Sequence, residues 1–407
     1  MVNGRAHSLV TSPVAELYVK WNTICTYSFA GFSDLDVACT CVRKRVPMHW
    51  QMPENLSTPA LLVDHCTLVG NIARMAAEMN ERGVDLRPHA KTHKSLDIAA
   101  LQRAHGATGL TVATVGEAEV FAAGGHDDLF IAYPVVAQRD KAERLARLSG
   151  SVRLSVGVDS IRAGELLAKA GLSGALRAMV EIDPGQHRSG VVPSEAGALA
   201  AALVDLGLRV EGVFTHGGHG YRTLDAPEGA ARDEVEGLQE AVAALAARGI
   251  PAVRVSAGST PTAARSAMRP VTEERPGTYV FNDRQQVALG TARESEVALA
   301  VAATVVSTAA AGHVVLDAGT KALGSDRPGW LEGFGVVPEL DDAVVTSLSE
   351  CHGIVALGDR RPPPIGTLVR VVPNHVCPTV NLFDFYHVVS NGEIVERWPV
   401  SARGHLS

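Results

Sequence analysis

Short β-branched runs alternate with helix-forming stretches from Val84 to Phe281, and this alternation restricts the possible folds more than any other feature of the chain. The eight strand-like runs are Val84–Arg87, Gly109–Ala113, Leu129–Ala132, Arg153–Val158, Arg177–Ile182, Val210–Thr215, Val253–Ser256 and Gly277–Phe281. Helices are expected between them, for example at Val115–Ala123, Ile161–Ala170, Ser194–Leu206 and Asp233–Arg248. Eight successive strand–helix units predict an α/β fold, a (β/α)8 barrel of the TIM type.

The pattern changes after about Glu294, where the long helical stretches stop. Strand-like runs follow at Val297–Thr308, His313–Leu316, Gly353–Ala356, Leu368–Val372 and Glu393–Trp398. Gly and Pro separate them, which predicts a mainly antiparallel β domain. The earlier segment Thr58–Asp64 is also strand-like and is a candidate to pair with this domain. Val297–Leu316 is apolar but interrupted by Thr, Ser, Gly and His, so it favours two strands around a turn over a membrane span.

These patterns divide the chain into four parts. We expect an irregular N-terminal extension (1–56), a strand that joins the β domain (57–72), the barrel (73–293) and the C-terminal β domain (294–407). Residues 1–50 lack periodicity, which suggests that they precede the native start, with Met48 or Met52 as alternative starts. They also lack the charged start and apolar run of a signal peptide.

Composition narrows the classes of partner. The 407 residues carry a net charge of −7 and only 5% aromatic residues. This balance argues against a nucleic-acid or anionic-membrane partner. The six cysteines contain no C-x-x-C pair, which is typical of a reducing compartment, and we expect a cytoplasmic protein.

Polar side chains follow several of the predicted barrel strands, at the end where the chemistry of such barrels is located. Lys91 lies in the segment Arg87–Lys94 after the first strand. A lysine there can be desolvated and made nucleophilic. Outside a barrel, a lysine among histidines is more often a surface residue.

A loop and a turn follow two later strands. In Ser256–Thr262, Gly258 permits close backbone approach and Ser259 and Thr260 supply hydroxyls, so the loop is either a phosphate cradle or a plain helix N-cap. After the fifth strand, Asp183-Pro-Gly forms a tight turn. Arg188 then either reaches the barrel mouth, to bind a ring nitrogen or a carboxylate, or forms a structural ion pair.

Several histidines have metal-ligand spacings. His375 and Cys377 would share one face of an extended segment, and an imidazole with a thiolate favours Zn²⁺. Alone, an H-x-C is a weak signal. Further ligands or supporting residues are sought at Glu350 and His352, and weaker metal candidates are His89 with His93 and His216 with His219.

Taken together, the motifs resemble the D-threonine aldolase/D-serine dehydratase group of fold-type III pyridoxal 5′-phosphate enzymes, which is related to alanine racemase. They are Thr58–Asp64, Arg87–Lys94, Asp183–Gly190, Gly258–Thr262, Asp317–Leu323 and Pro373–Cys377. The resemblance implies that Lys91 binds the cofactor covalently, that Arg188 faces its pyridine nitrogen and that Gly258, Ser259 and Thr260 hold its phosphate. It also implies that His375 and Cys377 hold a divalent metal (Zn²⁺ favoured, Mn²⁺ or Mg²⁺ as alternatives). His216 and Tyr221 match pocket positions.

The implied activity is that of a homodimeric, metal-dependent lyase acting on D-β-hydroxy amino acids. Cys377 stands where the aldolases generally have aspartate, which favours a D-serine or D-3-hydroxyaspartate dehydratase. The alternative is retro-aldol cleavage to glycine and an aldehyde.

Three other classes remain as competitors. A racemase would need a second acid–base residue, usually a tyrosine, whose motif is missing. A non-catalytic cofactor carrier would consist of the barrel alone. A cofactor-free metallohydrolase would use the barrel histidines His89, His93, His216 and His219.

Overall fold

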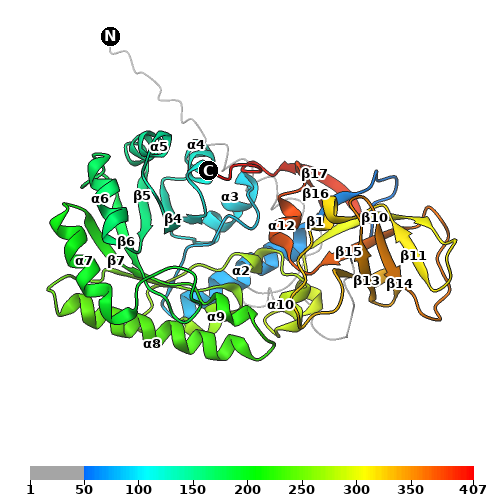
Figure 1. Ribbon diagram of the computed structural model, residues 1–407. Coiled ribbons are helices and arrows are strands. Elements are labelled where there is room, and N and C mark those ends of the chain that lie inside the picture. Colours follow the sequence, from blue (N-terminus) through cyan, green and yellow to red (C-terminus); the bar gives the residue numbers. More distant parts are fainter. Residues whose placement is uncertain (1–49) are drawn as a thin grey trace, which may run out of the picture. The chain divides into compact units, whose positions relative to one another are not determined.

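The computed structural model describes residues 50–407 (Figure 1). Most of the extension predicted for 1–56, including the alternative start at Met48, therefore lies outside the described residues. Within 50–407, no helix is long and apolar enough to cross a membrane.

Eight parallel strands form the predicted barrel, in the order β2-β9-β8-β7-β6-β5-β4-β3. A parallel bridge between His89 and Thr111 joins the chain after β2 to β3 and closes the sheet. The (β/α)8 architecture is therefore confirmed. The strands are β2 (Asp85–Leu86), β3 (Leu110–Val112), β4 (Asp128–Pro134), β5 (Arg153–Val158), β6 (Arg177–Glu181), β7 (Arg209–Phe214), β8 (Arg254–Ala257) and β9 (Glu273–Glu274).

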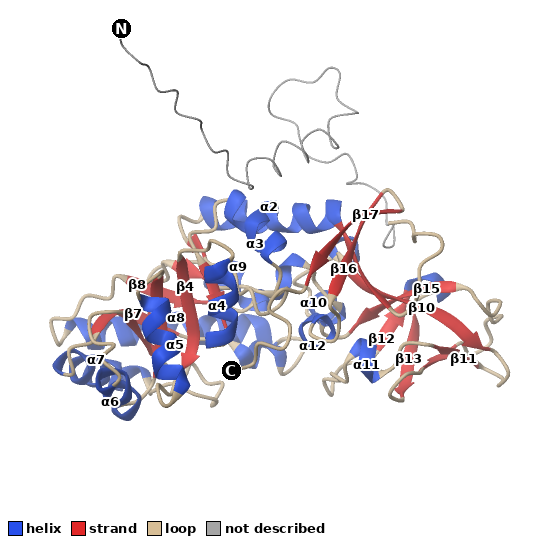
Figure 2. Cartoon of the chain, turned by 90° about the horizontal axis from the view of Figure 1, so that it is seen from above, coloured by secondary structure: helices blue, strands red, loops and turns tan. Residues whose placement is uncertain are grey.

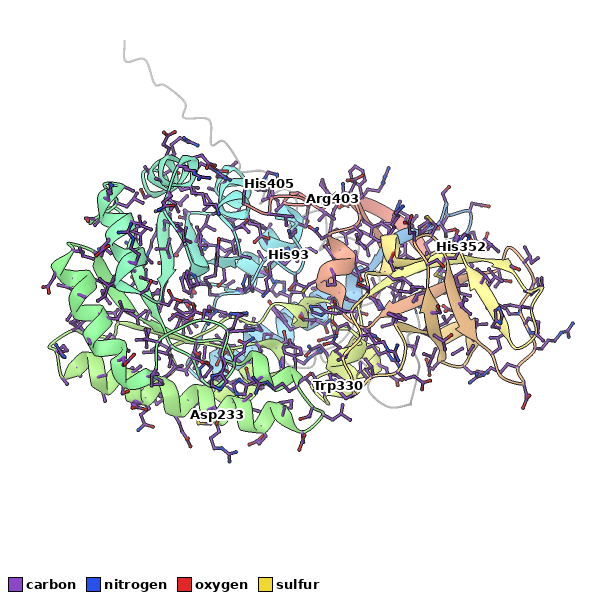
Figure 3. All side chains as sticks on the ribbon, viewed as in Figure 1. His93, Asp233, Trp330, His352, Arg403 and His405 are labelled. Carbon is purple, nitrogen blue, oxygen red and sulfur yellow. The ribbon has the colours of Figure 1, made fainter. Side chains whose placement is uncertain are left out.

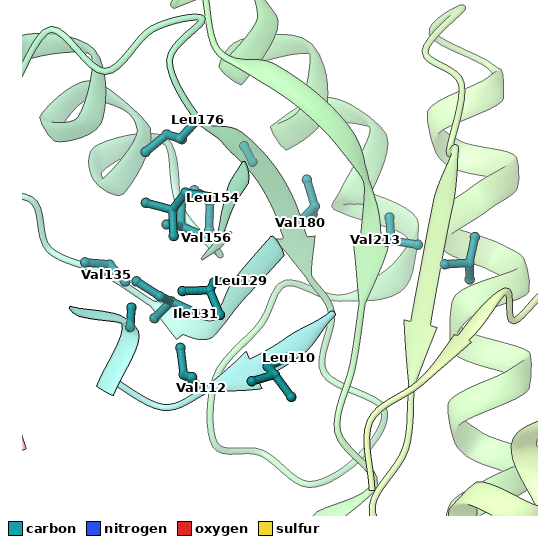
Figure 4. Close-up of a cluster of buried hydrophobic side chains, with 14 of the residues drawn as sticks. Leu110, Val112, Leu129, Ile131, Val135, Leu154, Val156, Leu176, Val180 and Val213 are labelled. Atoms are coloured by element: carbon teal, nitrogen blue, oxygen red, sulfur yellow. The ribbon is translucent and has the colours of Figure 1, made fainter. Parts of the chain in front are cut away.

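Helices cover the outside of this sheet, as α5 to α8 do around β4 to β7 in Figure 1. Leu, Ile and Val side chains such as Leu129, Ile131 and Val156 fill the space between sheet and helices (Figure 4). This apolar layer explains why the strand-like runs of the sequence are rich in β-branched residues. The helices are α2 (His65–Glu81), α3 (Leu96–Ala104), α4 (Val115–Ala123), α5 (Asp140–Ser149), α6 (Ile161–Lys169), α7 (Ala196–Asp205), α8 (Ala226–Ala246) and α9 (Thr260–Ser266).

The eighth barrel strand is not where the sequence predicted it. It is β9, Glu273–Glu274, whereas Thr278–Val280, inside the predicted Gly277–Phe281 strand, forms a 3-10 helix. Glu273 can be buried because its Oε2 accepts a hydrogen bond from Arg87 at 2.6 Å and its Oε1 accepts one from Ser256 at 2.6 Å. Two adjacent acids do not match an apolar strand pattern, so only these partners on the neighbouring strands account for the strand.

The C-terminal domain is a nine-stranded sheet in the order β11-β14-β13-β12-β15-β10-β1-β16-β17. Because β10 also pairs with β11, the strands from β11 to β10 close into a small antiparallel barrel. The strands are β1 (Ala60–Asp64), β10 (Leu299–Ser307), β11 (His313–Leu316), β12 (Gly335–Val337), β13 (Ala343–Leu348), β14 (Gly353–Ala356), β15 (Leu368–Pro373), β16 (Phe385–Ser390) and β17 (Glu393–Pro399). The sequence analysis missed β12, β13 and β16.

The N-terminal strand β1 pairs with this domain, as expected, antiparallel to β10 and parallel to β16. It ends at Asp64, whose carboxylate caps the next helix by accepting from Thr67 N at 2.8 Å. Residues 65–72, predicted as part of the joining strand, therefore belong to α2. The apolar stretch Val297–Leu316 contains β10 and β11, two antiparallel strands, as predicted.

Short helices fill the region between the barrel and the β domain. Figures 1 and 2 both show α10 (Arg284–Ala288) and α12 (Val376–Val380) there. The described chain also contains, in other parts of the sequence, the short helices α11 (Thr320–Leu323), η2 (Pro193–Glu195), η3 (Gly218–Tyr221), η4 (Thr278–Val280), η5 (Glu294–Glu296) and η6 (Pro338–Leu340).

Candidate active site

Lys91 lies in the turn that follows β2, at the carboxyl end of the barrel strands, and is half-buried. No hydrogen bond or ion pair of its Nζ occurs among residues 50–407. Burial lowers the pKa of this amine; the charges of Arg188 and Arg275 lower it further, against the opposing charges of Cys377 and Glu117. A free amine with a lowered pKa is suited to act as a nucleophile or a base.

The neighbouring Lys94 differs in its surroundings. It is buried, and its Nζ pairs with Glu117 Oε1 at 3.2 Å. The second carboxylate oxygen of Glu117 accepts from Ala113 N at 2.6 Å, which fixes the start of α4. Lys94 is therefore held as a structural ion pair, and Lys91 alone of the two presents a free amine.

The barrel histidines do not form the metal site considered above. Both ring nitrogens of His93 are engaged, with Gln102 Oε1 at 3.2 Å and Ser95 N at 3.1 Å. His219 Nε2 instead contacts Asp233 Oδ2, 3.1 Å away. In the described chain, no group of three or more His, Cys, Asp or Glu side chains is arranged to hold a metal. The structure thus offers no support for a cofactor-free metallohydrolase.

His89 and His216 line the same region as Lys91. Burial and the charge of Lys91 hold the pKa of each well below its ordinary value, so both rings remain neutral near neutral pH. His216 Nδ1 lies 3.3 Å from the carbonyl oxygen of Gly258. The predicted pocket residue His216 is therefore in contact with the predicted phosphate loop.

The Gly258–Thr260 loop connects β8 to α9. Gly258 has a φ of 103°, and a Cβ there would lie 2.0 Å from Glu274 Oε2, so only glycine fits. Ser259 and Thr262 form a capping box, with Ser259 N donating to Thr262 Oγ1 at 3.0 Å. Thr260 Oγ1 accepts from Tyr279 N at 3.1 Å. The N-cap interpretation is thus correct, and it leaves the loop compatible with a phosphate as well.

Arg188 and Asp183 do not pair with one another. Arg188 lies 3.9 Å from Glu181 Oε1, and its side chain is half exposed. Asp183 instead stabilises its own turn, where Oδ1 accepts from Gly185 N at 2.9 Å and Oδ2 contacts His187 Nδ1 at 2.8 Å. The charge of Arg188 nevertheless lowers the pKa of both Lys91 and His216.

Tyr221 lies on the other side of the site, near the β domain. Its hydroxyl accepts from Gln286 Nε2 at 3.2 Å, and its carbonyl accepts from the indole of Trp330 at 3.0 Å (Trp330 is labelled in Figure 3). Burial raises the pKa of Tyr221, and the charges of Asp283 and Cys377 raise it further. Tyr221 therefore stays protonated and available as a hydrogen-bond donor.

His375 and Cys377 are adjacent in space, but not through the extended segment that the sequence predicted. His375 is the N-cap of α12, and Cys377 lies within that helix. The two side chains are close enough for each to shift the pKa of the other. Burial would raise the pKa of the Cys377 thiol, but His375 and Lys91 lower it below its usual value, which favours the thiolate. A thiolate beside an imidazole fits a zinc-type site.

Sequence reasoning missed Asp283, which orients this pair. Its buried Oδ2 lies 3.1 Å from His375 Nδ1 and accepts from Val376 N at 3.1 Å. A carboxylate on Nδ1 leaves Nε2 as the metal-binding nitrogen, which is the usual support of a metal-bound histidine. The only sequence signal for Asp283 was its position as an N-cap: its Oδ1 accepts from Gln286 N at 2.9 Å.

Glu350 and His352 do not join the site. Both are exposed on the turn between β13 and β14, and Glu350 pairs with Lys321 at 2.7 Å. Figure 3 shows His352 on the β domain, away from His93 in the barrel. The sequence hypothesis that they serve as additional ligands is therefore wrong.

Comparisons with known proteins cover both domains. The family model of the alanine racemase N-terminal domain matches residues 63–285, and that of a putative serine dehydratase domain matches 298–389. The chain is 39% identical to the D-threo-3-hydroxyaspartate dehydratase of Delftia sp. over 370 residues, which is 84% of this chain and 97% of that protein. It is 33% identical to the D-threonine aldolase of Arthrobacter sp. over 364 residues, 86% of this chain and 93% of that protein. The crystallised Delftia enzyme superimposes with a TM-score of 0.78 at 37% identity, covering 85% of this chain and 97% of that chain.

Proposed function

The chain belongs to the fold-type III pyridoxal 5′-phosphate lyases that join an alanine racemase-like domain to a serine dehydratase domain, and we propose that it is a dehydratase of D-β-hydroxy amino acids such as D-serine or D-threo-3-hydroxyaspartate. One contact carries the proposal. Cys377, which lies beside His375, contacts the loop that contains Lys91, with Cys377 Sγ 3.3 Å from Thr92 Oγ1. Cleavage of the aldolase type is the second candidate, and the similarity to the Arthrobacter enzyme favours it.

The residues present fit the cofactor. Lys91 offers an unpaired amine for covalent attachment, Arg188 a guanidinium for the pyridine nitrogen, and the Gly258–Thr260 loop a site for the phosphate. When bound, the cofactor supplies an electron sink that stabilises negative charge on the α-carbon of the substrate.

The residues also fit a divalent metal. His375 and Cys377 would hold it, with Asp283 fixing the imidazole, and two protein ligands leave positions for water and substrate. The thiolate favours Zn²⁺ over Mn²⁺ or Mg²⁺. When bound, the metal supplies a Lewis acid for the β-hydroxyl oxygen of the substrate.

The protein's own groups then account for the proton transfers. The amine of Lys91, with its lowered pKa, is placed to take the α-proton of a D-amino acid. His89 and His216 stay neutral, so neither ring repels a cationic group of the substrate. Loss of water across Cα–Cβ and hydrolysis of the resulting enamine yield a keto acid and ammonia. Cleavage of Cα–Cβ yields glycine and an aldehyde.

Product analysis by mass spectrometry tests the proposal. Protein loaded with pyridoxal 5′-phosphate and Zn²⁺ is incubated separately with D-serine, D-threonine and D-threo-3-hydroxyaspartate, with L-serine as the stereochemical control. We expect a keto acid and ammonia from the D-substrates only. Glycine and an aldehyde from D-threonine, without a keto acid, would establish the aldolase instead.

We also propose that the protein is a cytoplasmic homodimer. We further propose that its two functional domains are the barrel of residues 73–293 and the β domain of residues 294–407. Among the described residues, Cys351 and Cys377 are free thiols, which suits a reducing compartment. Sedimentation analysis tests the oligomeric state.

A further inference from the structure

Two fully buried carboxyl groups lie beneath the loops that surround the proposed cofactor site. Glu234 comes from α8 and Glu274 from β9, and each residue is 0% exposed. The mechanism above uses neither of them. Buried acids without a cationic partner in direct contact are costly, so their retention calls for an explanation.

Glu234 connects two loops through one oxygen atom. Its Oε1 accepts hydrogen bonds from Gly217 N at 2.7 Å and from Gly258 N at 3.0 Å. Gly217 follows β7 directly after His216, and Gly258 opens the proposed phosphate loop after β8. The side chain therefore fixes the spacing of two loops that come from neighbouring strands.

Both glycines are packed tightly against the two acids. A Cβ on Gly217 would lie 2.7 Å from Glu234 Oε2, and one on Gly258 would lie 2.0 Å from Glu274 Oε2. Glycine is needed at both positions because the acid side chains occupy that space. The carboxyl groups and the loops thus form one packed unit.

The second oxygen of each carboxyl group has no hydrogen-bond donor. Among the described residues, Oε2 of Glu234 and Oε2 of Glu274 are both buried and unpartnered, whereas Glu274 Oε1 accepts from Ser266 at 2.8 Å. Burial raises the pKa of each acid, and the charge of Glu234 raises that of Glu274 further. The charge of Glu273 raises the pKa of Glu274 as well, and the charge of Arg275 lowers it without cancelling the effect.

We propose that Glu234 and Glu274 act together as positioning residues that hold the Gly217 and Gly258 loops in the conformation that receives the cofactor phosphate. The phosphate is that of the cofactor in the proposed function, on which the inference rests. Glu234 acts through two backbone amides, whereas Glu274 acts through its packing against Gly258, and neither acts on the substrate.

Titration with two forms of the cofactor separates this role from a general effect on folding. Pyridoxal 5′-phosphate and pyridoxal, which lacks the phosphate, are added to the apo-protein, and binding is followed by visible absorbance. The variants are Glu234→Ala and Glu234→Gln, and Glu236→Ala, which removes an exposed acid of the same helix, is the matched control. Thermal unfolding of each apo-protein is measured alongside.

We expect Glu234→Ala to weaken pyridoxal 5′-phosphate binding about ten- to hundredfold, because two buried amides lose their acceptor. Pyridoxal binding should change by less than about threefold. Glu234→Gln should remain close to wild type, since its amide oxygen keeps both acceptor bonds. Should Glu234→Ala not fold, Glu234→Asp, whose shorter side chain cannot reach both amides, is expected to show the same selective loss.

Equal losses for both ligands, or no loss for either, would overturn the positioning role. A Glu234→Gln variant as weak as Glu234→Ala would overturn it as well, because the Gln side chain keeps both acceptor bonds. If the wild-type protein binds neither ligand, the proposed function itself fails, which is a result distinct from wild-type binding with unaffected variants.

Discussion

Cys377 Sγ lies 3.3 Å from Oγ1 of Thr92, the residue next to Lys91. Cys377 belongs to α12 and Thr92 to the turn after β2, so this contact joins the candidate metal pair to the candidate cofactor lysine. A second contact supports the same junction, because the hydroxyl of Tyr386 in β16 donates to the carbonyl of His93 at 2.5 Å. The residues that would hold the metal therefore lie next to the lysine that would hold the cofactor.

Replacing Lys91 by alanine should abolish both the cofactor's absorption band and the activity. The variant loses the only unpaired amine of the Lys91–Lys94 segment, and we expect activity to fall about a thousandfold or more. Visible spectra and product formation are measured, with Lys169→Ala, on the exposed end of α6, as control. A full-strength band in the Lys91 variant would exclude this residue.

Removal of the metal should abolish activity but leave the cofactor band in place, since His375 and Cys377 are separate from the residues proposed to bind the cofactor. Dialysis against a chelator followed by addition of Zn²⁺ tests this, and the activity should return. Unchanged activity after verified metal removal would rule out the metal role.

Replacing Asp283 by asparagine should weaken metal binding by about ten- to hundredfold, because the imidazole of His375 loses its carboxylate partner at 3.1 Å. The measurement is a competition titration with a metal indicator. Asn can still accept from Gln286 N, so α10 should keep its cap. A variant with wild-type metal affinity would show that Asp283 serves only as the N-cap of α10.

Replacing Cys377 by aspartate should retain metal binding and shift the preference from Zn²⁺ towards Mn²⁺ or Mg²⁺, because a carboxylate is a harder ligand than a thiolate. Metal content and metal-dependent activity are compared across the three ions. A variant that no longer binds the cofactor would instead show that Cys377 matters for the integrity of the site, through its contact with Thr92.

Stability should fall between pH 7 and pH 5, with His93 as one cause. Burial lowers the pKa of His93 from 6.5 to about 3, so below pH 6.5 the unfolded chain binds a proton that the folded protein does not. At pH 5 this costs about 2 kcal/mol of unfolding free energy. Urea unfolding at both pH values should show a smaller pH effect in His93→Asn, although that variant is less stable at pH 7. An unchanged pH effect would contradict the assignment.

Local sequence patterns were sufficient where a residue's neighbours lie close in the chain. Val115–Ala123 and Arg153–Val158 were predicted at their observed bounds because apolar spacing and the Thr114 cap act within one element. The sequence analysis placed Lys91 and the Gly258 loop at the same end of the barrel, because parallel strands bring their carboxyl ends to one face.

The sequence by itself thus determined the barrel, the β domain and the main candidate residues, since periodicity and strand-end position are local properties. Only the tertiary structure decided which charges could be buried. Glu273 and Asp283 are acids that sequence patterns assign to the surface, yet each is buried against residues distant in the chain. Their burial depends on hydrogen bonds that exist only after folding, because an isolated charge is too costly to remove from water without such partners.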